Sequence, residues 1–109
     1  GSSHAAANAR TASVTAALAA GTRWAGIRVA FATGPTPTVA EGIEQLRAHG
    51  ARRITVAPWF IAPGRITDRV AAAVTEAGLA MSEPLGAHQL VAATVLDRFD
   101  QAIAQRRAA

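Results

Sequence analysis

Apolar residues recur along this chain at two spacings, and each spacing predicts a different kind of element. Compact apolar runs at 27–32, 54–61 and 79–81 predict short, mostly buried strands. Because Pro58 cannot donate a ladder hydrogen bond, we expect the second of these strands to end near Ala57. Apolar residues three and four positions apart predict helices within 8–20, 38–49, 66–77 and 88–107.

The predicted helices carry recognisable start signals and apolar faces. Thr38 and Glu41 have the spacing of a capping box, while Thr36 before Pro37 is a competing start for the same helix. In the last helix the apolar residues repeat so that one face would pack inward. The residues expected on that inward face are Val91, Val95, Leu96, Phe99 and Ile103.

Helices and strands alternate strictly in this prediction, which indicates an α/β fold with a parallel sheet covered by helices on both faces. The 109 residues fit one compact domain, residues 1–109. In open sheets of this kind ligands bind beyond the carboxyl ends of the strands. We therefore expect the loops 33–37, 58–65 and 82–88 to form the site.

The first four residues, Gly-Ser-Ser-His, allow two interpretations. They are either a remnant of cloning or the exit loop of a strand that would precede the first helix and is absent from this numbering. In the second interpretation His4 lies at the first turn of a helix, at the same edge as the other loops. The order of the loops favours this second interpretation.

The composition excludes several kinds of chemistry. There is no cysteine, which rules out disulfides, thiolate nucleophiles and zinc–thiolate sites. The net charge is +4, but all 11 basic residues are scattered arginines without interleaved aromatics, which argues against a nucleic-acid partner. No apolar run reaches the roughly 18 residues that a membrane span needs, and no signal peptide is apparent. We therefore expect a soluble, cytoplasmic protein without a membrane partner.

Few residues on the predicted loops carry chemistry. Arg65 could receive a carboxylate and Trp59 could line a flat apolar pocket, although a solvated arginine and a core tryptophan are commoner. His88, at the start of the last helix, is either a cap or a ligand. We expect no carboxylate pair here, because Glu83 alone is close and Asp68 lies within a helix. The usual acid–base and Ser-His-Asp sets are therefore not assembled.

Four stretches of the chain resemble the sirohydrochlorin chelatases, the small class II chelatases of siroheme and cobalamin synthesis. The family's first loop is similar to GSSHAAANAR, and its second strand and helix are similar to RVAFATGPTPTVAEGIEQL. Its third strand and loop are similar to GARRITVAPWFIAPGRITDRV, and its last segment to PLGAHQLVAATVLDRFDQA. The combination of APWFIAPGRITDRV with PLGAH is the specific part of this resemblance.

The resemblance implies a chelatase-like parallel sheet in flavodoxin-like order, whose central first strand is absent from this chain. It also implies a lyase-type enzyme that inserts Fe²⁺ or Co²⁺, the substrate metal, into sirohydrochlorin, a carboxylate-rich tetrapyrrole, with no organic cofactor. His4 is then the candidate catalytic group and, with His88, the candidate metal ligand. The candidate substrate-binding residues are Ser2, Ser3, Thr33, Trp59, Arg65 and His88.

The chain differs from the family pattern at the loops. Thr33 stands where the family typically has a glutamate, Pro63-Gly64-Arg65 stands where it commonly has Gly-Gly-His, and the family's first histidine would precede Gly1. Such ligand-poor sequences resemble the second half of two-domain members, so we expect a second chelatase lobe in cis or in a dimer. The alternatives are a non-catalytic tetrapyrrole-binding or assembly domain and an unrelated flavodoxin-like anion-binding domain.

Overall fold

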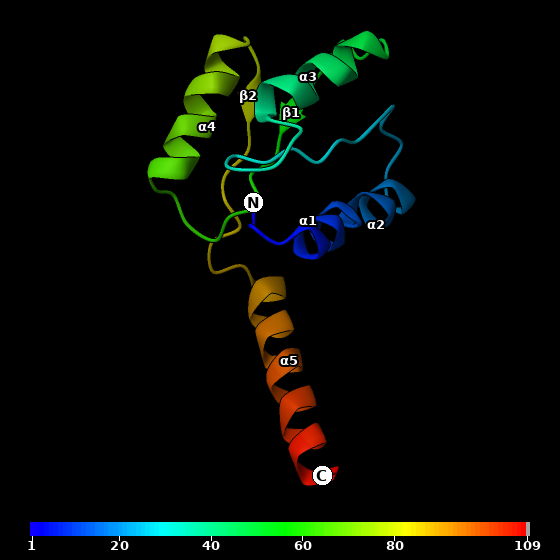
Figure 1. The fold of residues 1–109 in the computed structure, drawn as a ribbon, viewed down its shortest axis with the longest axis vertical. Helices are drawn as coiled ribbons and strands as arrows, with labels where there is room; N and C mark the ends of the chain where they lie inside the picture. Colours follow the sequence, from blue (N-terminus) through cyan, green and yellow to red (C-terminus); the bar gives the residue numbers. More distant parts are fainter. Residues whose placement is uncertain (109) are drawn as a thin grey trace.

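The computed structural model describes residues 1–108, in which helices predominate over strands. The elements follow one another along the chain as Figure 1 shows. In chain order they are α1 (Ala5–Ala12), α2 (Val14–Ala20), α3 (Val39–Ala48), β1 (Thr55–Val56), α4 (Arg65–Glu76), β2 (Ala80–Met81) and α5 (Gln89–Ala108).

The sheet of the described chain consists of β1 and β2, which run parallel with Thr55 opposite Ala80 and Val56 opposite Met81. The Ser82 amide continues the ladder by donating to the Val56 carbonyl at 2.9 Å. Because α4 connects the two strands, this part of the chain is a parallel βαβ unit, compatible with the predicted α/β class. β1 ends before Pro58, as its missing N–H predicts.

The first predicted strand, 27–32, does not join this sheet. Its one bridge links Phe31 to Thr38, and the Phe31 amide donates to the Pro37 carbonyl at 2.9 Å. The segment lies against α3, where a Cβ on Gly42 would come within 3.2 Å of the Ala30 Cβ. Apolar β-branched residues favour an extended backbone, but a ladder also needs a neighbouring strand, and none of residues 1–108 supplies one here.

The core lies where α3 and α4 pack together and α4 covers β2. Its apolar members are Ile43 of α3 and Val70 and Val74 of α4, which are 5%, 7% and 1% exposed. Arg47 of α3 also donates to the Ala77 carbonyl just beyond α4, at 3.0 Å. This bond joins the carboxyl ends of the two helices.

The helix predicted over 8–20 is divided into α1 and α2 at Ser13. The Ser13 hydroxyl donates to the Arg10 carbonyl at 2.6 Å, a local bond that competes with regular helical pairing. α3 begins as the capping box predicts, because the Thr38 hydroxyl accepts the Glu41 amide while the Glu41 carboxylate accepts the Thr38 amide.

The last helix departs from the sequence expectation. α5 extends away from the sheet and from the other helices as a separate arm (Figure 1). Val95, Leu96 and Phe99 were expected inside but are 62%, 62% and 60% exposed, whereas Val91 and Ile103 are half-buried. The expectation is wrong because periodicity identifies an apolar face but does not supply a surface to cover it, and the two short strands offer none.

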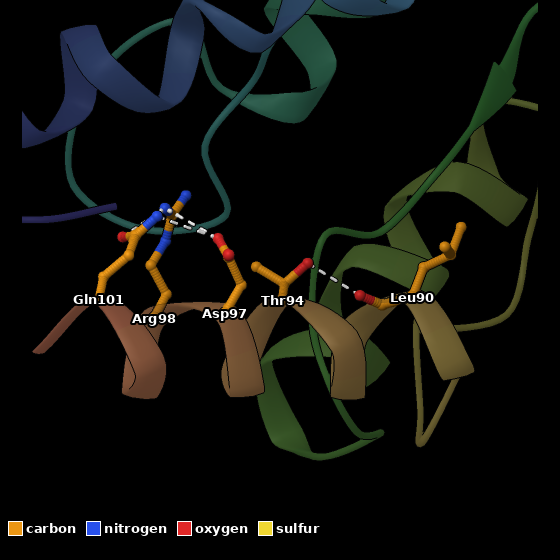
Figure 2. Close-up of polar contacts among 5 residues, drawn as sticks. All are labelled: Leu90, Thr94, Asp97, Arg98 and Gln101. Carbon is orange, nitrogen blue, oxygen red and sulfur yellow. Dashed lines mark hydrogen bonds and ion pairs between the residues drawn. The ribbon is translucent and has the colours of Figure 1, made fainter. Parts of the chain in front are cut away.

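The polar side chains of α5 bond within the helix rather than to another element. Figure 2 shows Thr94 donating to the Leu90 carbonyl at 2.8 Å and Gln101 donating to the Asp97 carboxylate at 3.1 Å. Arg98 donates to Gln101 at 3.2 Å and lies 3.6 Å from Asp97. Although α5 is 20 residues long, neither it nor any other helix in residues 1–108 is long and apolar enough to cross a membrane.

The position of α5 makes the molecule elongated. Its extents are 51, 29 and 28 Å, and its radius of gyration is 16.2 Å. A compact domain of this length would have a radius of gyration of about 13 Å. The difference agrees with a small core that holds α3, α4 and the sheet but leaves α5 outside.

Replacement of Val74 tests this description of the core. Val74→Ala removes two buried carbon atoms and should lower the free energy of unfolding by about 2 kcal/mol in urea denaturation. The matched control is Val95→Ala on the exposed face of α5, which should change that free energy by less than about 0.5 kcal/mol. Equal losses at the two positions would contradict the packing described above.

Candidate functional site

The loops that follow β1 and β2 are bonded to each other at the carboxyl edge of the sheet. The Leu85 amide donates to the Phe60 carbonyl at 2.8 Å, and the Gly86 amide donates to the Ile61 carbonyl at 2.7 Å. Gly86 has a positive φ of 61°, which a residue with a side chain rarely adopts. The two loops therefore form one backbone surface, as the rule for parallel sheets predicts.

The first loop is held by a residue of α1. The Asn8 side chain accepts the Ser2 amide at 2.8 Å and donates to the Ser2 carbonyl at 2.7 Å. The Ser2 hydroxyl in turn accepts the His4 amide at 3.1 Å. This reciprocal amide clamp fixes the backbone of Ser2, whereas the side chains of Ser3 and His4 remain exposed.

The first loop also lies against the loop that follows residue 32. Gly1 N is 3.4 Å from the Thr33 hydroxyl. A Cβ on Gly1 would overlap both the Pro35 ring and the Thr33 carbonyl, so only a glycine allows this approach. The structure therefore brings together two of the segments expected at the site, 1–4 and 33–37.

The third loop is anchored where it enters α4. The Thr67 hydroxyl accepts the Gly64 amide at 2.6 Å and donates to the Gly64 carbonyl at 2.8 Å. Thr67 is 4% exposed, so water does not compete for these bonds. The position of Arg65, the first residue of α4, is set by this anchor.

The predicted histidines occupy different kinds of position. His4 is the residue before α1, and its exposed ring has no hydrogen-bond partner within residues 1–108. His88 is the residue before α5, and its Nδ1 atom accepts the Leu90 amide at 3.1 Å. Because Nδ1 accepts a hydrogen bond, a neutral His88 ring carries its proton on Nε2. A metal ion could bind Nδ1 only if the bond to Leu90 opened, and could bind Nε2 only if the proton left that atom.

The other predicted substrate-binding residues are accessible. Trp59 is 57% exposed, and Arg65 is exposed with no salt bridge to any described residue. Thr33 is half-buried in the second loop. Within the described part of the chain, no group of three or more histidine, aspartate or glutamate residues is arranged to hold a metal ion.

A cavity of about 330 Å³ lies between α4 and the exit of β2. Asp68 and Glu83 both line it, together with the polar residues Thr67, Thr75 and Ser82. Asp68 lies within α4, as expected, and Glu83 lies on the loop after β2, so the two carboxylates reach the lining of this cavity from different elements. This set of oxygen atoms could accept protons or hard cations.

A second cavity, of about 250 Å³, lies between the second loop and the opposite side of α4. Thr33, Thr38 and Arg69 are its polar lining side chains. Sequence reasoning had selected Thr33 but missed Arg69. The available signal was the four-residue spacing from Arg65, which places both guanidinium groups on one face of α4.

The parallel βαβ unit and its bonded exit loops define a small α/β protein, a class in which ligands commonly bind beyond the carboxyl ends of the strands. The family model CbiX matches residues 1–102. The chain therefore belongs to the CbiX family, the sirohydrochlorin chelatases. At the level of the family, the activity is insertion of a divalent metal into a tetrapyrrole in cobalamin or siroheme synthesis. No curated protein matches this chain.

Removal of the amide clamp tests the structure of the first loop. Asn8→Ala deletes both bonds to Ser2, so the amide order parameters of Ser2 and Ser3 should fall from about 0.85 to below about 0.6 in NMR relaxation. Arg10→Ala, on the same helix, is the matched control and should leave them unchanged. Order parameters for Ser2 that are equal in the parent and Asn8→Ala would show that the clamp does not order the loop.

Proposed function

We propose that this chain is one chelatase-type domain of a cytoplasmic sirohydrochlorin chelatase and inserts Fe²⁺ or Co²⁺. The tetrapyrrole would lie against the exit loops, in contact with Ser2, Ser3, Thr33, Trp59 and Arg65. A second chelatase lobe, in cis or from a dimer partner, would cover its other face.

The observation that carries this proposal is the pairing of the exit loops. The first loop contacts the second at Gly1 and Thr33, and the third is bonded to the fourth through Phe60 and Leu85. The contacts support two paired loop surfaces, each built from segments that are remote in sequence. Trp59 and Arg65 are both exposed, near the two ends of the segment 58–65, and these residue types suit a ligand that is both flat and anionic.

His4 is the proposed group for metal delivery and proton transfer. Its ring is exposed and makes no bond within residues 1–108, so a nitrogen lone pair is available in the neutral form. Insertion replaces two pyrrole N–H protons by the metal ion, and these protons must reach an acceptor. The His4 imidazole could take one proton at a time and pass it to water.

An exposed apolar surface supports a second lobe. The apolar residues of α5, including Leu96 and Phe99, are exposed, and a surface of this kind is commonly covered by another part of an assembly.

The second candidate function is tetrapyrrole binding without catalysis. The specific observation in its favour is the His88 cap, since the Leu90 amide occupies one ring nitrogen. If His88 only caps α5, the domain has one fewer side chain that could bind a metal ion. The same exit loops would then bind the tetrapyrrole without exchanging its pyrrole protons.

A metal-insertion assay on the full-length protein separates the two functions. Anaerobic incubation with sirohydrochlorin and either Fe²⁺ or Co²⁺ should change the tetrapyrrole absorption spectrum faster than the protein-free background. Binding of sirohydrochlorin without acceleration would select the non-catalytic function. Neither binding nor acceleration would exclude both.

A histidine substitution tests the proposed catalyst. His4→Gln should lower kcat for insertion by about a hundredfold, because general acid–base groups typically contribute this much or more. His49→Gln is the matched control, since His49 follows α3 and its ring contacts the Gln45 carbonyl at 2.8 Å. The control should retain the parent rate, and an unchanged rate in His4→Gln would remove His4 from the mechanism.

A further inference from the structure

Charged residues of α4 point in different directions around the helix. Arg65 and Arg69 are one turn apart on one face, and neither forms a salt bridge or side-chain hydrogen bond with a described residue. Asp68 instead lines the cavity on the other side of the helix. Two arginines at this spacing repel each other unless an anion lies near them. On the side of α4 toward the second loop, Arg69 therefore has no ion-pair partner among the described residues.

The second cavity is lined by Arg69. Arg69 is the one ionisable side chain among its lining residues, and no carboxylate lines it. Its volume of about 250 Å³ is smaller than the roughly 300–1,000 Å³ of sites that enclose a whole drug-sized ligand. A cavity of this size suits one substituent of a larger molecule.

The polar groups of the cavity can donate to an anion. The Thr38 hydroxyl accepts the Glu41 amide at 3.2 Å, and the Thr33 hydroxyl accepts from Gly1 at 3.4 Å. Each hydroxyl also has one O–H donor, and neither donates to a described residue. Arg69 adds a planar fork that matches a carboxylate in geometry and charge.

We infer that Arg69, with the Thr33 and Thr38 hydroxyls, binds one peripheral carboxylate of the tetrapyrrole in this cavity. The inference rests on the proposed function for the identity of the ligand. It adds an anchoring residue, because Arg69 would hold a substituent at the rim of the ring and thereby fix the rotation of the ring over the exit loops. Arg69 contacts no reacting atom in this arrangement and is a positioning residue.

The test compares binding of sirohydrochlorin with binding of its fully methylated ester, which has no carboxylates, by quenching of tryptophan fluorescence. Arg69→Gln should weaken binding of the acid by about tenfold and leave binding of the ester unchanged. Arg69→Lys keeps the charge but loses the fork, and should fall between the parent and Arg69→Gln. The matched control is Arg106→Gln, an exposed arginine of α5, which should bind both ligands like the parent.

The outcomes distinguish this inference from the proposed function. Equal affinities of the parent and Arg69→Gln for the acid overturn the Arg69 subsite and leave the proposed function standing. Weaker binding of acid and ester alike in Arg69→Gln also overturns it, since the effect would not depend on a carboxylate. Binding of neither ligand by the parent overturns both proposals together.

Discussion

Burial of the inner face of α4 is the constraint on which the other contacts depend. Val70 and Val74 fill the space between α3 and the sheet, and Thr67 closes the same face at its amino end. These residues fix the rotation of α4 about its axis. Every other side chain of the helix then has a defined direction, which includes those toward the candidate site.

This rotation separates the charges at the ligand edge. Asp68 and Arg69 are adjacent in sequence, yet consecutive helical residues point about 100° apart, and they line different cavities. One side of α4 thus offers carboxylates that can accept protons, and the other offers a guanidinium group that can hold an anion. A chelatase requires both functions, since it must bind an acidic macrocycle and remove its pyrrole protons.

Much of the apolar surface remains outside the core. α5 has the apolar pattern of a buried helix, but most of these side chains are exposed within the described chain. Local propensity is sufficient to form a helix or an extended backbone, whereas burial requires a partner surface. The proposed second lobe would supply such a surface for α5.

The candidate site was predicted in part. Strand ends and loop order were enough to select segments 1–4, 33–37, 58–65 and 82–88, because the carboxyl ends of parallel strands share one edge. The cap formed by His88 and the role of Arg69 were not resolved by this rule, because they depend on which way a side chain points. Hydrophobic periodicity shows on which side of its own helix a residue lies, but not which other element that side contacts.

Local chemistry in the sequence determined the elements themselves: the capping box at Thr38, the end of β1 before Pro58 and the buried stripe of α4. The capping box and the strand end depend on interactions within a few residues. The buried stripe depends on the spacing of apolar residues along the helix, whatever apolar surface it packs against. The tertiary structure alone decided that Asp68 and Glu83 line one cavity, that Arg69 and Thr33 line another, and that α5 remains outside the core. Those outcomes depend on contacts between segments distant in sequence, whose geometry is fixed only when α3, α4 and the sheet pack together.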